Sequence, residues 1–175
     1  MGSEMCIRDS NKLYGLMTQD ATYSRDIPIV LSTNSDCELV DGLGTDANNT
    51  THERGAMNYN VSPGWSKLSN VWDAMYSIIE NANLIVEGIN KSSLLTSGDS
   101  DQRAMERFKG EALTIRAMVY FDLIRLFGDI PYKSESSNPD LGNVYLGKSD
   151  RDVIMDELIK DLETAITLLP WAGEV

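Results

Sequence analysis

From about residue 64 onward, apolar side chains recur at every third or fourth position, which is the spacing of an amphipathic helix. The pattern predicts three long helices, over about 64–90, 101–127 and 150–169. Gly128 suits the end of the second helix, because glycine readily adopts the left-handed conformation that closes a helix. Each apolar stripe is wide enough to contact two neighbouring helices. We therefore predict an all-α fold of stacked helical hairpins, of the kind that tetratricopeptide repeats form.

The first third of the chain follows a different pattern. Ser10 can cap a short helix that carries Leu13 and Leu16 at helical spacing. Residues 24–64 are rich in Gly, Asn, Asp and other turn formers, so we expect an irregular segment with at most a short strand at 27–31. A loop of this length inside a compact domain is typical of a functional segment, or of one that other parts of the protein order.

Residues 1–10 show neither helical periodicity nor the apolar run of a signal peptide. We expect them to be a head that is foreign to the native protein, followed by a partial helical domain over residues 11–175. A helical stack of this size leaves its end faces uncovered, so we expect the native domain to continue after Val175. We also expect the chain alone to be marginally stable or to associate.

Composition narrows the range of partners. The chain has 15 basic and 27 acidic side chains, which gives a formal net charge of −12. Nucleic-acid binding depends on clustered Lys and Arg, so this balance excludes that function, and it also disfavours docking onto an anionic lipid surface. No apolar run approaches the roughly 18 residues that a membrane-spanning helix needs.

Few side chains suit metal binding or catalysis. His52 is the single histidine, it lies in a polar segment, and no G-x-S-x-G nucleophile motif is present, so we interpret it as a solvated residue. Cys6 and Cys37 are too few for a structural zinc site and allow at most one disulfide. The acidic segment 36–48 offers oxygen ligands, but its spacing departs from the calcium-loop pattern, and we favour a solvated loop over a calcium site.

Charged residues on the predicted helices favour structural roles. Glu111 lies four positions after Arg107, and Asp122 lies three positions before Arg125, which are the spacings of ion pairs along one helix face. No pair of carboxylates stands out for acid–base chemistry. We therefore predict that the protein is not an enzyme and needs no cofactor.

Aromatic side chains in polar surroundings are the best candidates for ligand contact. Tyr59 stands between Asn58 and Asn60, and Trp65 follows a Pro-Gly pair. A sugar needs a flat ring for its C–H groups and amide groups for its hydroxyls. We predict Trp65, Tyr59 and Asn60 as ligand-binding residues. The alternative for Trp65 is that its ring packs against the start of the following helix.

The segment 109–131, KGEALTIRAMVYFDLIRLFGDIP, carries the most specific motif of the chain. It resembles the pattern G-E-A-x-x-x-R-A-x-x-Y-F-x-L-x-x-x-[FY]-G-x-[IV]-P of the SusD/RagB family, the outer-membrane nutrient-binding lipoproteins of Bacteroidota. The pattern W-x-x-M-Y-x-x-I-x-x-A-N at 72–83 and the closing helix at 151–170 resemble the same family. The resemblance extends over roughly residues 65–170.

The resemblance implies an all-α, tetratricopeptide-like N-terminal region of a surface-exposed lipoprotein. Members cover a TonB-dependent, SusC-like barrel transporter and pass oligosaccharides such as starch-like glycans, or in some cases peptides, to it. Cys6 has no lipobox before it, so the resemblance places the export signal and the lipid anchor outside these residues. Motif residues Glu111, Arg116 and Arg125 are interpreted as scaffold. The alternative is a helical-repeat scaffold that binds only protein.

Overall fold

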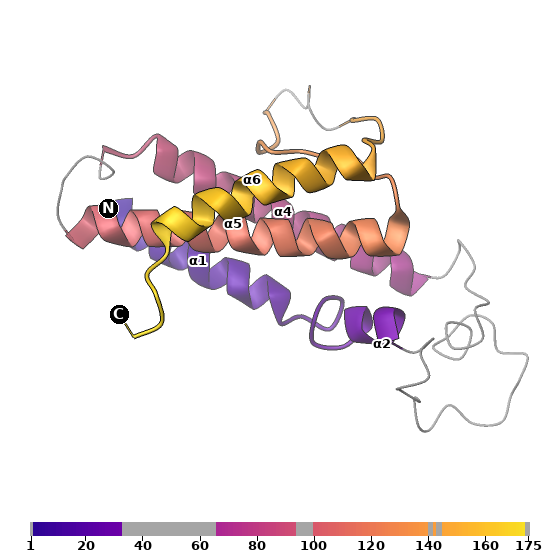
Figure 1. Ribbon diagram of the computed structural model, residues 1–175. Coiled ribbons are helices and arrows are strands. Elements are labelled where there is room, and N and C mark those ends of the chain that lie inside the picture. Colours follow the sequence, from indigo (N-terminus) through magenta and orange to yellow (C-terminus); the bar gives the residue numbers. More distant parts are fainter. Residues whose placement is uncertain (1, 33–65, 94–99, 140–141, 143–144, 174–175) are drawn as a thin grey trace, which may run out of the picture. The chain divides into compact units, whose positions relative to one another are not determined.

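The computed structural model describes residues 2–32, 66–93, 100–139, 142 and 145–173 (Figure 1). In this part of the chain no strand occurs, and a single antiparallel bridge joins Ile130 to Ser149. The predicted all-α fold is confirmed. The helices are, in order, α1 (Gly2–Met17), α2 (Asp26–Ser32), α4 (Ser66–Asn90), α5 (Ser100–Phe127) and α6 (Arg151–Leu168).

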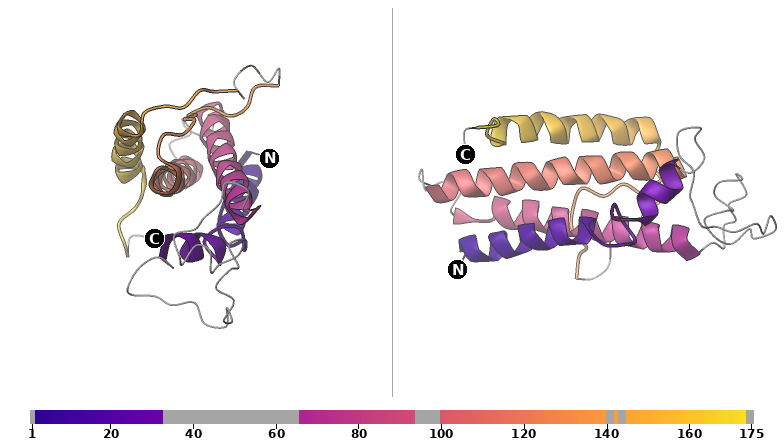
Figure 2. Two further views of the ribbon diagram at one scale, coloured as in Figure 1. Left: turned by 90° about the vertical axis from the view of Figure 1, so that its right-hand side faces the viewer. Right: turned by 90° about the horizontal axis from the view of Figure 1, so that it is seen from below.

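The chain divides into two compact units. One combines Met1–Tyr14 with Tyr76–Val175, and the other is Gly15–Met75. In the larger unit α5 lies between α6 and the second half of α4 (Figure 2). α5 and α6 pack against each other and run in opposite directions, so they form the helical hairpin that the sequence predicts.

α5 is the central helix of the larger unit, and most of its circumference is buried. It ends where the pattern predicts: Gly128 has φ +73°, and its amide donates to the Ile124 carbonyl at 2.9 Å. Nearer its start, Gly110 lets α6 approach closely, since a Cβ at this position would lie 2.8 Å from Cγ of Leu169. The buried apolar residues of α5 are Met105, Ala112, Leu113, Ile115, Ala117, Val119, Tyr120 and Leu123.

α6 begins one residue later than the pattern predicts. The sequence predicts that Ser149, with Asp152 three positions later, opens the helix. In the structure Asp150 is the N-cap, and its side chain accepts a hydrogen bond from the Asp152 amide at 2.8 Å. Ser149 instead uses its backbone, whose amide donates to the Ile130 carbonyl at 2.9 Å. The bridge fixes the position of Ser149, which leaves the next polar residue to cap the helix.

The helical periodicity of residues 64–90 predicts that Trp72 lies on the buried stripe of α4. In the structure Trp72 is only half-buried, whereas its neighbour Val71 is completely buried. The Cα–Cβ directions of successive helical residues differ by about 100°, so a small rotation of the helix exchanges such neighbours. The buried residues of α4 are Val71, Met75, Ile78, Ile79, Ala82, Asn83, Ile85 and Ile89.

α1 starts at Gly2, eight residues before the predicted cap at Ser10. Ser10 lies inside the helix, is buried, and donates from Oγ to Oε2 of Glu111 at 3.4 Å. The exposed side chains of Ile7 and Arg8 explain the missing periodicity, since an exposed helical turn needs no apolar residue.

The expected strand at 27–31 is wrong, because these residues belong to α2. A short apolar run fits a strand or a buried helix equally well. Pro28 is tolerated because it stands in the first turn, where a helix needs no amide donor. Within the smaller unit, Asp26 at the start of α2 forms an ion pair with Lys67 of α4 at 2.8 Å.

Candidate functional site

The sequence-predicted ligand residues Tyr59, Asn60 and Trp65 lie outside the described residues. The same holds for His52 and for the acidic segment 36–48. Their roles stay predictions. The described part of the chain instead defines the scaffold that follows this loop.

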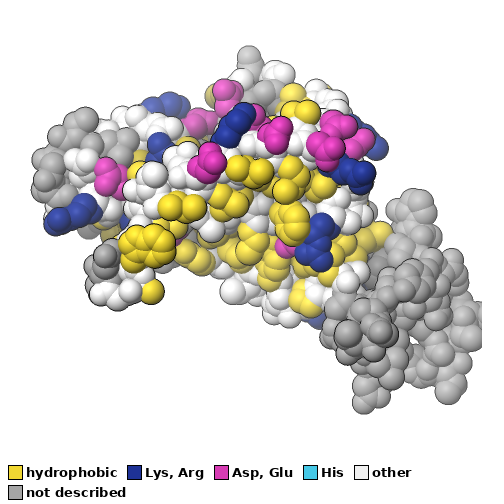
Figure 3. All heavy atoms as spheres, in the orientation of Figure 1, with side chains coloured by type: hydrophobic (Ala, Val, Ile, Leu, Met, Phe, Trp, Pro, Cys, Tyr) yellow, Lys and Arg dark blue, Asp and Glu magenta, His cyan; other side chains and the backbone are white. Residues whose placement is uncertain are grey.

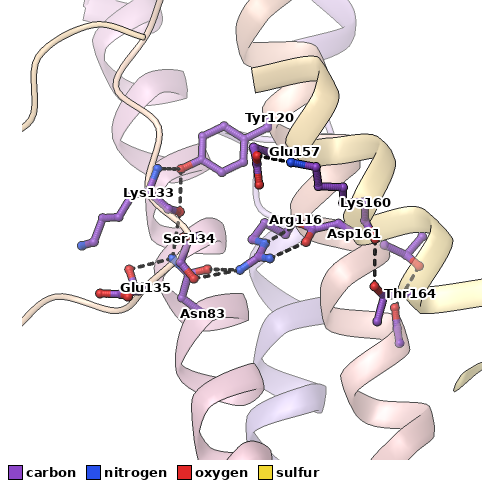
Figure 4. A network of polar contacts seen from close by, with 12 residues as sticks. Asn83, Arg116, Tyr120, Lys133, Ser134, Glu135, Glu157, Lys160, Asp161 and Thr164 are labelled. Atoms are coloured by element: carbon purple, nitrogen blue, oxygen red, sulfur yellow. Dashed lines mark hydrogen bonds and ion pairs between the residues drawn. The ribbon is translucent and has the colours of Figure 1, made fainter. Parts of the chain in front are cut away.

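A buried arginine forms the centre of that scaffold (Figure 4). Arg116 of α5 donates from Nε to Oδ2 of Asp161 at 2.8 Å and from Nη2 to Oδ1 at 2.6 Å. Its Nη1 donates to Oδ1 of Asn83 on α4 at 2.7 Å and to the Ser134 carbonyl at 3.1 Å. A planar guanidinium can satisfy all these acceptors at once, so one side chain joins three helical or loop segments.

The segment after α5, residues 131–137, lies along α4 as a strap. Tyr76 donates from its hydroxyl to the Pro131 carbonyl at 2.7 Å. Asn83 is completely buried, and its Nδ2 donates to the carbonyls of Lys133 at 3.2 Å and Glu135 at 2.9 Å. α4 therefore holds the backbone of the strap with side chains spaced at helical turns.

Two glutamates of α4 bind the end of the strap. Glu80 accepts from the Ser137 amide at 2.7 Å and from Nζ of Lys133 at 2.9 Å, while Glu87 accepts from the Ser136 amide at 2.6 Å. Burial alone would raise the pKa of Glu80, but these hydrogen bonds and the Lys133 charge lower it below its ordinary value. The Ser136 amide lowers the pKa of Glu87. Both side chains are therefore held as carboxylates.

Three tyrosines, two from the helices and one from the strap itself, pack together and stay neutral. The Tyr120 hydroxyl donates to the Lys133 carbonyl at 3.0 Å and accepts from the Lys133 amide at 2.9 Å. Its ring contacts those of Tyr76 and Tyr132, with centroids 6.3 Å and 5.0 Å apart. Burial raises the pKa of all three hydroxyls, that of Tyr132 to about 12. The hydroxyls of Tyr76 and Tyr120 serve as neutral hydrogen-bonding groups.

The two predicted ion pairs along α5 are confirmed. Nε of Arg107 lies 2.8 Å from Oε1 of Glu111, and Nη1 of Arg125 lies 3.0 Å from Oδ1 of Asp122. Tyr14 of α1 has a raised pKa because it is partly buried and lies beside the Glu111 charge. These motif side chains contact other parts of the protein, as scaffold residues do.

Sequence reasoning missed the two most exposed aromatic residues of the described part. Tyr145 is 92% exposed and Trp171 is 74% exposed. The signal that led to Trp65 was available for Trp171 as well, because Pro170 precedes it in a helix-ending segment.

An open hollow of about 400 Å³ lies where the start of α5 meets the end of α6. Two polar side chains in its wall already form hydrogen bonds with other residues of α5: Arg107 donates to Glu111, and Glu106 accepts from Gln102. A small-ligand site usually presents converging polar groups, and this wall offers few. We assign no ligand there. The lining residues are Arg103, Ala104, Glu106, Arg107, Leu168, Leu169 and Pro170.

The described residues form neither a metal-binding cluster nor a membrane-spanning helix. No three His, Cys, Asp or Glu side chains of this part gather closely enough to hold a metal ion. None of its helices combines the length and the apolar character that crossing a membrane requires.

Sequence comparison identifies the relatives of the chain. The sequence model of a SusD-like family, described as "Starch-binding associating with outer membrane", matches residues 12–174. SusD-like protein P25 of Formosa agariphila is 28% identical over 159 residues, and SusD-like protein P2 of the same organism is 26% identical over 164 residues. Each alignment covers 91% of this chain, but only 28% and 30% of the respective relative.

Solved structures share the fold. A SusD homologue from Bacteroides thetaiotaomicron matches with a TM-score of 0.84 and 23% identity, over 99% of this chain and 31% of that one. A laminarin-binding SusD-like protein matches with a TM-score of 0.76 and 21% identity, over 95% and 34%. Surface glycan-binding protein A from Bacteroides fluxus matches with a TM-score of 0.72 and 21% identity, over 93% and 32%.

The chain thus spans about a third or less of the length of these relatives. The family match nevertheless extends over nearly all of its residues, including the α5 motif and the hairpin that α5 forms with α6. The chain belongs to the SusD-like family.

Proposed function

We propose that this chain is part of a non-catalytic glycan-binding protein at the cell surface. In this proposal a lipid anchor elsewhere in the protein holds it at the outer membrane, where it delivers oligosaccharides to a TonB-dependent, SusC-like barrel transporter. The observation that carries the proposal is the family match over residues 12–174, whose description gives starch binding and the outer membrane. Two structural relatives named for laminarin binding and for surface glycan binding add support.

The roles of the motif side chains support binding over catalysis. Arg116 donates to Asp161, Asn83 and the Ser134 carbonyl, and Glu111 accepts from Arg107. These contacts make the second half of α4, together with α5 and α6, a rigid platform in the larger unit. A rigid platform suits a protein that presents loops to a ligand.

The proposed ligand residues are Trp65, Tyr59 and Asn60. Trp65 directly precedes Ser66, the first residue of α4, in the sequence. The ring would stack on the C–H face of a sugar, and Asn60 would bind its hydroxyls. Glucose polymers are the first ligands to test, because the family description names starch and one relative is named for laminarin.

Calorimetric titration with starch and laminarin oligosaccharides tests the proposal. The protein should be produced from its complete reading frame. We expect saturable binding that Trp65→Ala weakens by at least about tenfold, since stacking and burial of one ring contribute one to a few kcal/mol. Trp171→Ala is the matched control, because it removes an exposed indole from the end of α6 and should leave affinity unchanged. Loss of binding in the control alone would refute the assignment to the loop.

Co-purification from detergent-solubilised outer membranes tests the transporter partnership. We expect a barrel protein to be retained by the tagged wild type and by Trp65→Ala alike, because the glycan and the barrel would use different surfaces. Retention of the barrel with no binding across a broad glycan panel would instead favour the alternative function, a scaffold that binds only protein.

A further inference from the structure

A buried ion pair joins the two helices that flank residues 33–65. Asp26 is the first residue of α2 and Lys67 is the second residue of α4, and Nζ of Lys67 lies 2.8 Å from Oδ1 of Asp26. Only 4% of the Asp26 side chain and 15% of the Lys67 side chain are accessible. The two residues are 41 positions apart, so the pair links the two sides of a long stretch of chain.

Asp26 receives a second cation from the preceding residue. Nε of Arg25 donates to the same Oδ1 at 2.8 Å, and Nη1 of Arg25 donates to Oδ2 of Asp20 at 2.9 Å. Burial alone would raise the pKa of Asp26, but the hydrogen bonds and charges of Arg25 and Lys67 lower it below its ordinary value. Asp26 is therefore held as a carboxylate inside the smaller unit, where two cations offset its loss of contact with water.

The turn between α1 and α2 fixes the position of Asp26. The Asp26 amide donates to the Asp20 carbonyl at 2.9 Å, and the Ile27 amide donates to the Thr22 carbonyl at 3.0 Å. Thr22 is completely buried, and its hydroxyl donates to the carbonyl of Met17, the last residue of α1, at 2.8 Å. A helix of seven residues such as α2 is not stable by itself, so its position depends on contacts like these. The ion pair adds the contact that holds α2 against the first turn of α4.

This contact matters for the proposed ligand residues. Trp65, Tyr59 and Asn60 all lie in the sequence between α2 and α4, and Lys67 follows Trp65 by two positions. Ordering a chain segment on ligand binding costs conformational entropy, and this cost is smaller when the ends of the segment are already held. A pair that joins the start of α4 to α2 therefore reduces the entropic cost of binding before a ligand arrives.

We propose that Asp26 and Lys67 are positioning residues for glycan binding, which hold the two helices on either side of residues 33–65 together. Both side chains are too deeply buried to contact a ligand themselves. The inference rests on the proposed function, because it concerns the segment that carries the proposed ligand residues.

Calorimetric titration with starch and laminarin oligosaccharides tests the inference on the protein made from its complete reading frame. We expect Asp26→Asn and Lys67→Met each to weaken affinity by ~fivefold or more, because the ordering cost then falls on binding. Lys67→Arg keeps a cation for Asp26 and should retain most of the affinity. The two sides of the pair are changed separately, so a single misfolded variant does not decide the outcome.

Two controls separate positioning from general destabilisation. Asp122→Asn makes the same substitution at a carboxylate whose side chain is 10% accessible and which pairs with Arg125 at 3.0 Å, but in the larger unit. Ile166→Ala truncates an exposed side chain of α6, where hydrophobic side chains gather over α5 and α6 (Figure 3). Both controls should bind the oligosaccharides as the wild type does.

Hydrogen exchange followed by mass spectrometry gives a readout that needs no ligand. The backbone amides of α2 and of the second turn of α4 should exchange at least ~tenfold faster in Asp26→Asn than in the wild type, and Asp122→Asn should leave them unchanged. Unchanged exchange in Asp26→Asn would overturn the inference, because the pair would then hold neither helix in place.

The remaining outcomes distinguish this inference from the proposed function. Equal affinity of Asp26→Asn and the wild type would overturn the inference and leave glycan binding intact. Equal losses in Asp26→Asn and Asp122→Asn would also overturn it, because general destabilisation would explain both. A wild type that binds none of the oligosaccharides would refute the proposed function, and the positioning role would fall with it even where exchange is faster.

Discussion

Arg116 and Asp161 face each other across the α5–α6 interface with two parallel hydrogen bonds, 2.8 Å from Nε to Oδ2 and 2.6 Å from Nη2 to Oδ1. Both side chains are largely buried, with 5% and 13% of their surface accessible. The bidentate geometry specifies how far α6 can slide along α5. This contact therefore sets the register of the hairpin.

Arg116→Met should destabilise the protein by about 3–5 kcal/mol, because it leaves Asp161 as a buried charge without its partner. Urea unfolding followed by circular dichroism measures the change. Lys160→Met is the control, since Lys160 pairs with Glu157 on the exposed surface of α6, where solvent screens the two charges. A loss below about 1 kcal/mol for Arg116→Met would contradict this role of the pair.

Acid should loosen the strap. The folded-state pKa values of Glu80 and Glu87 lie below the ordinary value of 4.5, so their stabilisation is complete above that pH and is lost as the pH falls through the lowered values. Glu80→Gln with Glu87→Gln should lower the unfolding free energy at about pH 6 and flatten its decline towards about pH 3.

Urea titrations at several pH values compare this double variant with the wild type. Glu163→Gln removes an exposed carboxylate of α6 and serves as the control, with a pH profile parallel to that of the wild type. If the unfolding free energy of the double variant declined with falling pH as steeply as that of the wild type, other carboxylates would be the cause of the acid sensitivity.

Gly110 and Gly88 should respond differently to substitution by alanine. Both lie inside helices, where alanine is favoured over glycine by up to about 1 kcal/mol. The added Cβ meets no atom within 4 Å at Gly88, but at Gly110 it would lie 2.8 Å from Cγ of Leu169. Thermal unfolding should show Gly88→Ala as stabilising and Gly110→Ala as less stable than Gly88→Ala by about 1–3 kcal/mol. Equal effects would show that Leu169 relaxes at no cost.

The cap of α6 can be tested with neighbouring substitutions. Asp150→Ala removes the acceptor of the Asp152 amide and should cost about 0.5–2 kcal/mol in urea unfolding. Ser149→Ala keeps the backbone bridge to Ile130 and should change stability by less than about 0.5 kcal/mol. The opposite order would restore Ser149 as the cap.

Features that depend on local spacing could be predicted from the sequence. α5 begins and ends within one residue of the predicted 101–127, because a long apolar periodicity and Gly128 define it. The Arg107–Glu111 pair follows from i, i+4 geometry alone.

Features that depend on distant partners could not be predicted. Asp161 lies 45 positions after Arg116, and Asn83 binds backbone carbonyls that no sequence pattern specifies. The helical periodicity of residues 64–90 places Asn83 on the apolar stripe, where the structure buries it, but that periodicity gives no indication of its partners. The exposure of Trp171 depends on what covers the end of α6, which is again a non-local property.

The strap is held through its main chain, and this has a consequence for how the protein can change. The side chains of α4 and α5 bind the carbonyls of Lys133, Ser134 and Glu135. Any residue type offers the same backbone carbonyl, so the residues at positions 134 and 135 can be substituted without loss of these hydrogen bonds. Asn83 and Arg116 cannot, because their side chains are the donors. Mutational tolerance is therefore expected at positions 134 and 135 of the strap, and intolerance at the helix residues that bind their carbonyls. New surface chemistry can arise on the strap without a change in its path.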